Sequence, residues 1–284
     1  MCPRCGVVVE KALRAQAFGM AAPSPSVRAD LERARIERVA AVAELKTRAL
    51  ALPVALVCAR LAAAVAPGPV RVLAMWLHES GHAMAAWMCG YLAWPGPWFT
   101  PVGTEPSRLL TITLLGVLAH AAWRAHQAER RFWLAASIAG MLLVGVCTFG
   151  LRPGQAQQLI VFAGDGGSFV LGTTLMLTMF ARPDHAVRRE HLRWVFVAIG
   201  ALAFMDAWTT WTGPIEGVPF GESDHGLSDP SVLVEEFGWG MLQLTQRYRK
   251  VAYACLATLA LAMLAGIVVP AATYYRKLTT ENTE

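Results

Sequence analysis

The stretch VRVLAMWLHESGHAMAAWMCGYLAW, residues 70–94, carries most of the information about fold and function. A helix rises about 1.5 Å per residue, so a segment of this length can cross a hydrocarbon core of about 30 Å. Its middle nonetheless holds three ionisable side chains, His78, Glu79 and His82. Ionisable groups inside a membrane are costly, and they usually mark a functional site. We therefore expect a membrane-spanning helix that carries a polar centre.

The whole chain has the composition of a membrane protein. Of its 284 residues, 55% are hydrophobic and only 16% are charged, against about 25% charged in an ordinary soluble domain. The mean hydropathy is +0.42. These values exclude a disordered chain and an ordinary soluble enzyme. They predict an all-α, polytopic membrane helix bundle with about six to seven transmembrane spans. The apolar runs cover 49–66, 70–94, 108–122, 132–151, 157–180, 194–211 and 251–275.

The polar segments around these runs define the expected organisation. Residues 1–48 are predicted to be a basic, helical, cytoplasmic segment with a lone Cys-x-x-Cys near its start. A transmembrane domain follows over 49–275, with an extramembrane loop at 212–250, and a cytoplasmic tail occupies 276–284. The net charge of +5 fits cytoplasmic loops better than nucleic-acid contacts. We expect an integral, multi-pass protein of the cell (inner) membrane, with the lipid bilayer and no nucleic acid among its partners.

The distribution of Lys and Arg predicts the orientation. Arginines follow the runs 108–122 and 157–180, so these loops are expected inside, while the acidic loop at 212–246 is expected outside. The run 70–94 then passes from inside to outside. Because a full crossing by 49–66 would export the basic N-terminal segment, we expect this short, arginine-containing run to be re-entrant or interfacial. The alternative is seven full spans with an exported N-terminus.

The pattern His78-Glu79-Ser80-Gly81-His82 has the spacing of a zinc centre on a helix. Side chains at positions i and i+4 project from one face, so both imidazoles can bind one zinc ion. Glu79 stands beside the first ligand, where a carboxylate can take a proton from a zinc-bound water. Gly81 and the alanines after His82 make one side of the helix small, which favours close packing against a neighbouring span.

The segment HESGHAMAA, from His78 to Ala86, resembles the His-Glu-x-Gly-His-x-x-x-Ala signature of the site-2 protease family of intramembrane zinc metalloproteases. The resemblance implies an endopeptidase that cleaves a peptide bond in or near a transmembrane helix of a membrane protein substrate. It implies that His78 and His82 bind zinc and that Glu79 is the catalytic base. It also implies a third ligand, an aspartate on a later span.

Two aspartates lie inside apolar runs and are candidates for this third ligand. Asp165 lies in the sequence Gly-Asp-Gly-Gly, which resembles the Asp-Gly-Gly turn of the family and lets the backbone come close to a metal. Asp206 lacks such a turn, but its span is expected to run parallel to the histidine span, as in the family. The glycines of 164–172 would then line the closely packed span between them. Both aspartates remain candidates, and the span direction slightly favours Asp206.

A second class of protein would share some of these features. A metal-ion carrier or a degenerate, non-catalytic protease-like scaffold would also place histidines and aspartates inside the membrane, but it has no need of Glu79. The loop at 212–250 contains Asp224, His225 and Asp229. We expect this loop to be solvated, and the alternative is that it covers the outer mouth of the site.

Overall fold

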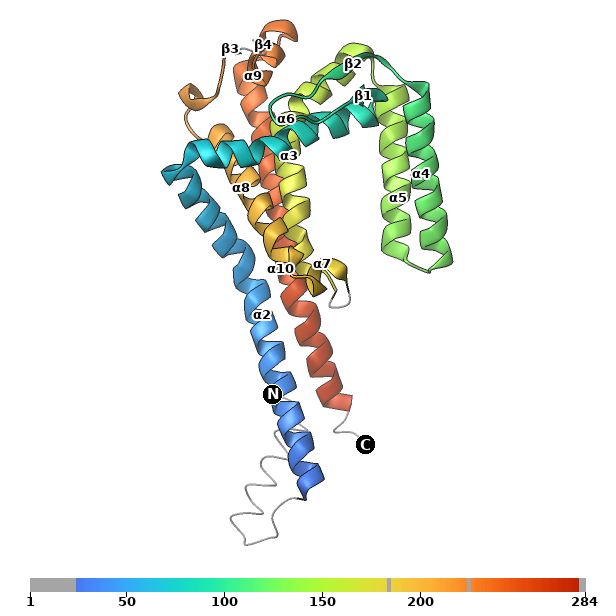
Figure 1. Ribbon diagram of the computed structural model, residues 1–284, viewed down its shortest axis with the longest axis vertical. Helices are drawn as coiled ribbons and strands as arrows, with labels where there is room; N and C mark the ends of the chain where they lie inside the picture. Colours follow the sequence, from blue (N-terminus) through green and yellow to red (C-terminus); the bar gives the residue numbers. More distant parts are fainter. Residues whose placement is uncertain (1–23, 183–184, 224–225, 281–284) are drawn as a thin grey trace.

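The computed structural model describes residues 24–182, 185–223 and 226–280, and Figure 1 shows them as a bundle of helices. About 81% of the structure is helical, which confirms the expected all-α class. The Cys-x-x-Cys of residues 2–5 lies outside the described residues, as do Asp224 and His225. The features predicted for these positions therefore stay predictions.

The elements are connected by short segments. The long helices are α2 (Pro25–Val65), α3 (Pro67–Met88), α4 (Arg108–Gln127), α5 (Arg131–Gly145), α6 (Pro153–Leu177), α8 (Leu192–Thr212) and α10 (Met241–Thr280). Single turns are η1 (Val146–Gly150), η2 (Thr178–Phe180), α7 (Ala186–Arg189), η3 (Ile215–Gly217), α9 (Asp229–Ser231) and η4 (Val232–Glu236). Two antiparallel hairpins pair β1 (Tyr91–Ala93) with β2 (Val102–Pro106) and β3 (Glu222–Ser223) with β4 (Gly226–Leu227).

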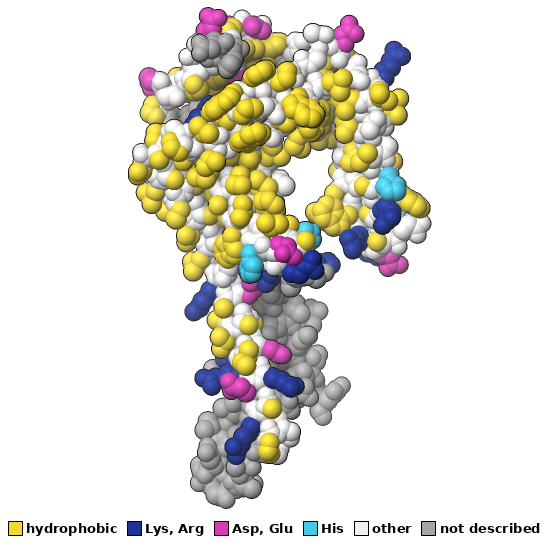
Figure 2. Space-filling view, in the orientation of Figure 1, with side chains coloured by type: hydrophobic (Ala, Val, Ile, Leu, Met, Phe, Trp, Pro, Cys, Tyr) yellow, Lys and Arg dark blue, Asp and Glu magenta, His cyan; other side chains and the backbone are white. Residues whose placement is uncertain are grey.

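Within the described residues, five helices are long and apolar enough to cross a membrane. They cover Arg35–Val65, Arg131–Gly150, Pro153–Phe180, Leu192–Thr212 and Met241–Val268. Figure 2 shows hydrophobic side chains over the bundle and the α4–α5 hairpin, and many Lys and Arg side chains toward one end. The expected count of about six to seven spans is not confirmed, because α3 and α4 are not among the five.

The histidine helix α3 lies across the bundle rather than along it (Figure 1). Here the structure differs from the prediction that the run 70–94 crosses the membrane from one side to the other. The physical reason lies in the ionisable side chains of α3, which have polar partners on α6, on α8, on α9 and on the loop between β1 and β2. A helix that crosses its neighbours can reach all of these partners, whereas a parallel helix reaches fewer.

The run 49–66 also differs from expectation. It is the last part of α2, a continuous helix of 41 residues that includes Pro53, rather than a re-entrant segment. In Figure 1, the start of α2 lies toward the same end of the molecule as α7, the α4–α5 turn and the end of α10. The strands and α9 lie toward the opposite end. After α3, which lies across the bundle, α4 leads the chain back toward the end at which α2 begins.

Glycines allow α3 and α6 to touch backbone to backbone. A Cβ atom on Gly81 would collide with the carbonyl oxygen of Ala163 and with Gly167, and a Cβ atom on Gly167 would collide with Gly81. The expected close packing of the histidine helix against a glycine-rich helix is confirmed. Below this crossing, α6, α8 and α10 share a core that includes Phe169, Phe204 and Tyr248. The crossing fixes how the histidines face α6.

Candidate metal centre

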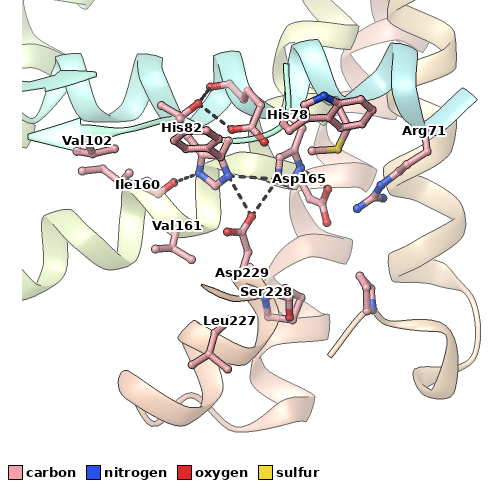
Figure 3. Close-up of a pocket in the computed structure, with 17 residues that line it drawn as sticks. Arg71, His78, His82, Val102, Ile160, Val161, Asp165, Leu227, Ser228 and Asp229 are labelled. Carbon is pink, nitrogen blue, oxygen red and sulfur yellow. Dashed lines mark hydrogen bonds and ion pairs between the residues drawn. The ribbon is translucent and has the colours of Figure 1, made fainter. Parts of the chain in front are cut away.

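Two imidazoles and one carboxylate converge between α3, α6 and α9. The Nε2 atoms of His78 and His82 lie 3.2 Å apart. Oδ2 of Asp229 lies 3.0 Å from each of them. Figure 3 shows the three side chains pointing toward one another. They form a group of ligand atoms that could hold one metal ion.

The far side of each imidazole is held by a hydrogen-bond acceptor. Nδ1 of His82 lies 2.7 Å from the carbonyl oxygen of Ile160, which can only accept, so Nδ1 carries the proton. Nδ1 of His78 lies 2.9 Å from Oδ1 of Asp165. The other oxygen of Asp165 accepts a hydrogen bond of 2.7 Å from Nε1 of Trp211, which can only donate. In the neutral rings, both Nε2 lone pairs therefore face Asp229.

The converging atoms have the pattern of a cation site. Oδ2 of Asp229 is buried and has no hydrogen-bond partner among the described residues. With neutral rings, two lone pairs and a carboxylate oxygen face one another, which is unfavourable unless a proton or a metal cation lies between them. Ligands at about 2.0–2.2 Å from a tetrahedral zinc ion lie about 3.3–3.6 Å apart, only slightly farther than the atoms seen here. The donor set of two imidazoles and a carboxylate suits zinc.

Gly164 provides the space for these three side chains. A Cβ atom at this position would lie 2.6 Å from Oδ2 of Asp229, from Cε1 of His78 and from Nε2 of His82. Such distances are far below van der Waals contact, so even alanine would displace the converging groups. The glycine of the Gly-Asp-Gly-Gly sequence is therefore needed for room at the site rather than for a turn, because α6 is helical throughout this stretch.

Asp229 comes from the loop predicted to be extramembrane, and the sequence did not single it out as a ligand. It begins α9, where Pro230 occupies the first turn of the helix. Burial acts to raise the pKa of Asp229, but the nearby charges of protonated His82 and His78 have the larger effect and hold that pKa below its usual range. Without a metal, Asp229 is therefore an ionised carboxylate paired with protonated imidazoles, and a bound metal ion would take the place of those protons. The Asp-Pro pair indicates a fixed turn, but nothing in it identifies the partners of Asp229.

The two aspartates predicted as third ligands have other partners. Asp206, the slightly favoured candidate, forms an ion pair with Arg71 at 3.0 Å between Oδ2 and Nη1. Asp165 contacts His78 on the side of the ring opposite to Asp229. The structure thus places a different carboxylate at the convergence point. The physical reason is that α3 lies across α6, which turns both Nε2 atoms toward the loop that follows α8.

Glu79 is buried beside the two histidines, with 3% of its surface exposed. Its carboxylate accepts a hydrogen bond from the hydroxyl of Thr100, a residue of the loop between β1 and β2. Glu79 is not one of the three converging ligands. A buried carboxylate next to the centre, yet outside the ligand set, has the position of a general base.

The centre opens into a cavity of about 390 Å³. Its polar lining includes the three converging side chains and Glu79. Its apolar lining comes from α3, from the β1–β2 hairpin, from α6, from the loop before α9 and from α9 itself. The residues are Met75, Trp98, Phe99, Val102, Ile160, Val161, Pro219, Leu227 and Pro230. A cavity with a polar centre and apolar walls suits a ligand that has a polar group to face the centre and apolar groups to contact the walls.

Comparisons of the chain with models of known protein families, with curated proteins and with solved structures gave no match.

Proposed function

We propose that the protein is a zinc-dependent intramembrane endopeptidase, in which His78, His82 and Asp229 hold the metal and Glu79 is the general base. The observation that carries the proposal is the convergence of three metal-binding atoms within 3.2 Å of one another, beside a buried glutamate that is not among them. A bound zinc ion would supply a water of lowered pKa and polarise the scissile carbonyl.

The side chains of the chain divide the remaining work. Glu79 accepts a proton from the attacking water and later donates it to the leaving amine. Asp165 and the carbonyl oxygen of Ile160 keep the two imidazoles in the tautomer that presents Nε2. The apolar walls of the cavity exclude bulk water from the peptide bond while leaving the polar centre accessible.

The proposed substrate is a segment of a membrane protein. The site lies against Gly164, near the middle of the membrane-crossing candidate Pro153–Phe180. A peptide bond that reaches this depth belongs to a transmembrane helix or to the chain directly next to one. Because the backbone of an intact helix is fully hydrogen-bonded, the substrate helix must unwind locally before Glu79 and the metal can act.

The proposed location is a multi-pass position in the cell (inner) membrane. The basic α7 region and the arginines of the α4–α5 turn lie toward the same end as the start of α2 (Figure 1). Positive residues favour the cytoplasm, so this end is proposed to be inside. With α2 proposed to cross the membrane and α3 proposed not to cross it, the start of α2 is proposed to lie inside as well.

A metal-ion carrier or a non-catalytic scaffold is the competing function. Both would use the three converging side chains, but neither requires a buried carboxylate beside them. The hydrogen bond from Thr100 to Glu79 favours the enzyme, because it positions a carboxylate that the metal group does not use. Loss of Glu79 should therefore stop the activity of an enzyme but should leave a carrier or a scaffold unaffected.

The decisive variant is Glu79→Gln, which keeps the shape of the side chain and removes its basicity. The purified protein is assayed for bound zinc, and for cleavage of reporter proteins that each carry one transmembrane helix. We expect zinc to stay at the wild-type level and cleavage to fall at least about 100-fold. The matched control is Glu129→Gln, at an exposed position in the α4–α5 turn, which should cleave normally. Unchanged cleavage by Glu79→Gln would reject the mechanism, and loss of zinc would make Glu79 a ligand.

A further inference from the structure

Three arginines surround one glutamate where α2, α7 and α8 meet. Oε1 of Glu44 lies 2.9 Å from Nε of Arg48, 2.9 Å from Nη2 of Arg188 and 3.4 Å from Nη1 of Arg193. These four residues, here called the arginine cluster, come from segments more than a hundred residues apart in sequence. The fold therefore brings three positive charges to one point far from the metal centre.

The arginine cluster holds more positive than negative charge. Three guanidinium groups and one carboxylate leave a net charge of +2 among the described residues, and the arginine side chains are only 15%, 17% and 12% exposed. Like charges held this close repel one another, and the repulsion is weakly screened when the groups are partly buried. An anion that binds between the guanidinium groups would relieve this repulsion.

One donor of the arginine cluster has no hydrogen-bond partner among the described residues. Nε of Arg193 is buried and makes no hydrogen bond to any part of the chain that the structure describes. The other donors are used in part by the backbone, since Arg48 reaches the carbonyl oxygen of Gly266 and Arg188 that of Ala181. A guanidinium group with a free, buried N–H group suits an oxyanion, above all the oxygens of a phosphate group.

The position of the arginine cluster matches the level of lipid headgroups. Arg193 lies at the start of the membrane-crossing candidate Leu192–Thr212, and Arg48 directly precedes the most apolar part of α2. The guanidinium carbon of Arg193 lies 5.1 Å from the ring centre of the half-exposed Trp194. Tryptophan is enriched at the membrane–water interface, where phosphate groups are concentrated. Figure 2 shows Lys and Arg side chains gathered below the apolar part of the surface.

We propose that the arginine cluster binds a phosphate group, supplied by the headgroup of an anionic phospholipid at the proposed cytoplasmic face. Basic pockets between membrane helices on this side recognise such headgroups by the same chemistry. Binding would join α2 to the α7–α8 segment through the phosphate oxygens. The proposal does not depend on the enzymatic function, because none of its residues lines the metal centre.

The test compares Arg188→Gln/Arg193→Gln with Arg189→Gln. Arg189 belongs to the same turn, but its side chain is 69% exposed and pairs only with Glu190 among the described residues, so it controls for the loss of surface charge. Detergent-purified proteins are titrated with phosphatidylglycerol or phosphatidylcholine, and bound lipid is counted by native mass spectrometry. We expect the wild type and Arg189→Gln to bind phosphatidylglycerol at least about tenfold more tightly than the double variant. Phosphatidylcholine should show no such difference.

A second measurement on the wild type needs no variant. Phosphatidylglycerol and inorganic phosphate are each tested for an increase in melting temperature. An increase with the lipid alone assigns the phosphate to a headgroup, and an equal increase with inorganic phosphate assigns it to the free anion. Equal binding of phosphatidylglycerol by the wild type and the double variant would overturn the proposal. So would a wild type whose melting temperature responds to neither ligand.

Discussion

The hydroxyl group of Thr100 lies 2.8 Å from Oε2 of Glu79 and 2.9 Å from the backbone carbonyl oxygen of the same residue. Its single proton is shared between the two acceptors. The contact joins the β1–β2 hairpin to α3 at the residue proposed as general base, and it makes Thr100 a positioning residue.

Thr100→Val should lower kcat about tenfold and leave zinc content unchanged. The hydrogen bond to a charged group contributes about 1.5–3 kcal/mol, and its loss frees the carboxylate to turn away from the water. Thr100→Ser keeps the hydroxyl and should restore most of the rate. Steady-state kinetics on a cleaved reporter measures the effect. An equal loss in both variants would mean that Thr100 acts through packing alone.

Asp229→Ala should lower zinc affinity about 100-fold or more. Loss of a residue that only hydrogen-bonds to a metal ligand lowers metal affinity about 10–100-fold, and loss of a ligand itself should have a larger effect. Asp206→Asn should retain zinc, since Asp206 pairs with Arg71. Competition with a fluorescent chelator measures both. The reverse result, with zinc lost only from Asp206→Asn, would return the ligand role to the residue that the span direction favoured.

Asp165→Asn should weaken zinc binding about 10–100-fold without removing it. The amide can still contact Nδ1 of His78, but it no longer stabilises the proton there, so the ring is free to adopt the other tautomer. Trp211→Phe removes only the hydrogen bond to Asp165 and should have a smaller effect. Titration calorimetry with zinc measures the zinc affinity of both variants. A complete loss of zinc in Asp165→Asn alone would identify Asp165 as a direct ligand.

Gly164→Ala should weaken zinc binding about 10–100-fold, because the added methyl group would press on all three converging side chains. Overpacking of this kind costs about 1–3 kcal/mol. Gly154→Ala is the matched control, since it lies on the same helix and a Cβ atom there has open space. Competition with a fluorescent chelator compares the zinc affinities of the two variants. An unchanged affinity in Gly164→Ala would show that the metal binds elsewhere.

Removal of zinc by a chelator should lower the melting temperature of the wild type. A ligand that binds only the folded state at about 100 times its Kd stabilises it by about 2.7 kcal/mol. The double variant His78→Ala/His82→Ala should melt at the same temperature with and without chelator. Differential scanning fluorimetry in detergent measures both. A wild type that is insensitive to the chelator would contradict a metal centre at these residues.

The metal-binding chemistry of α3 was predictable from the spacing of its two histidines and its glutamate. The residues of other elements that contact these side chains were not predictable. The i, i+4 histidines and the adjacent glutamate are a local pattern, so the sequence alone identifies them. Gly81 was also predictable as a contact, because small residues mark helix crossings. The direction of α3 was not, since a high content of apolar residues is shared by a spanning helix and by one buried across a bundle.

Asp229 could not be found by the same reasoning. From the sequence, the aspartates that point to a ligand role are those within apolar runs, where a charge needs an explanation. Asp229 lies in a polar loop, where an aspartate needs none, and only the tertiary path of the chain after α8 brings it to the histidines. The two aspartates within apolar runs are explained by a guanidinium partner and by an imidazole partner instead.

The contact of Gly81 with Gly167 has a consequence for motion. Because no side chain separates the two backbones, α3 cannot slide along α6 by one residue without forcing a larger side chain into the crossing. The floor of the centre is therefore rigid. In the proposed enzyme, a polypeptide substrate therefore has to enter through the walls, which are the strand hairpin bearing Thr100 and the loop bearing Asp229. Opening the second wall would withdraw one of the three converging atoms, so substrate entry would be coupled to the integrity of the proposed centre.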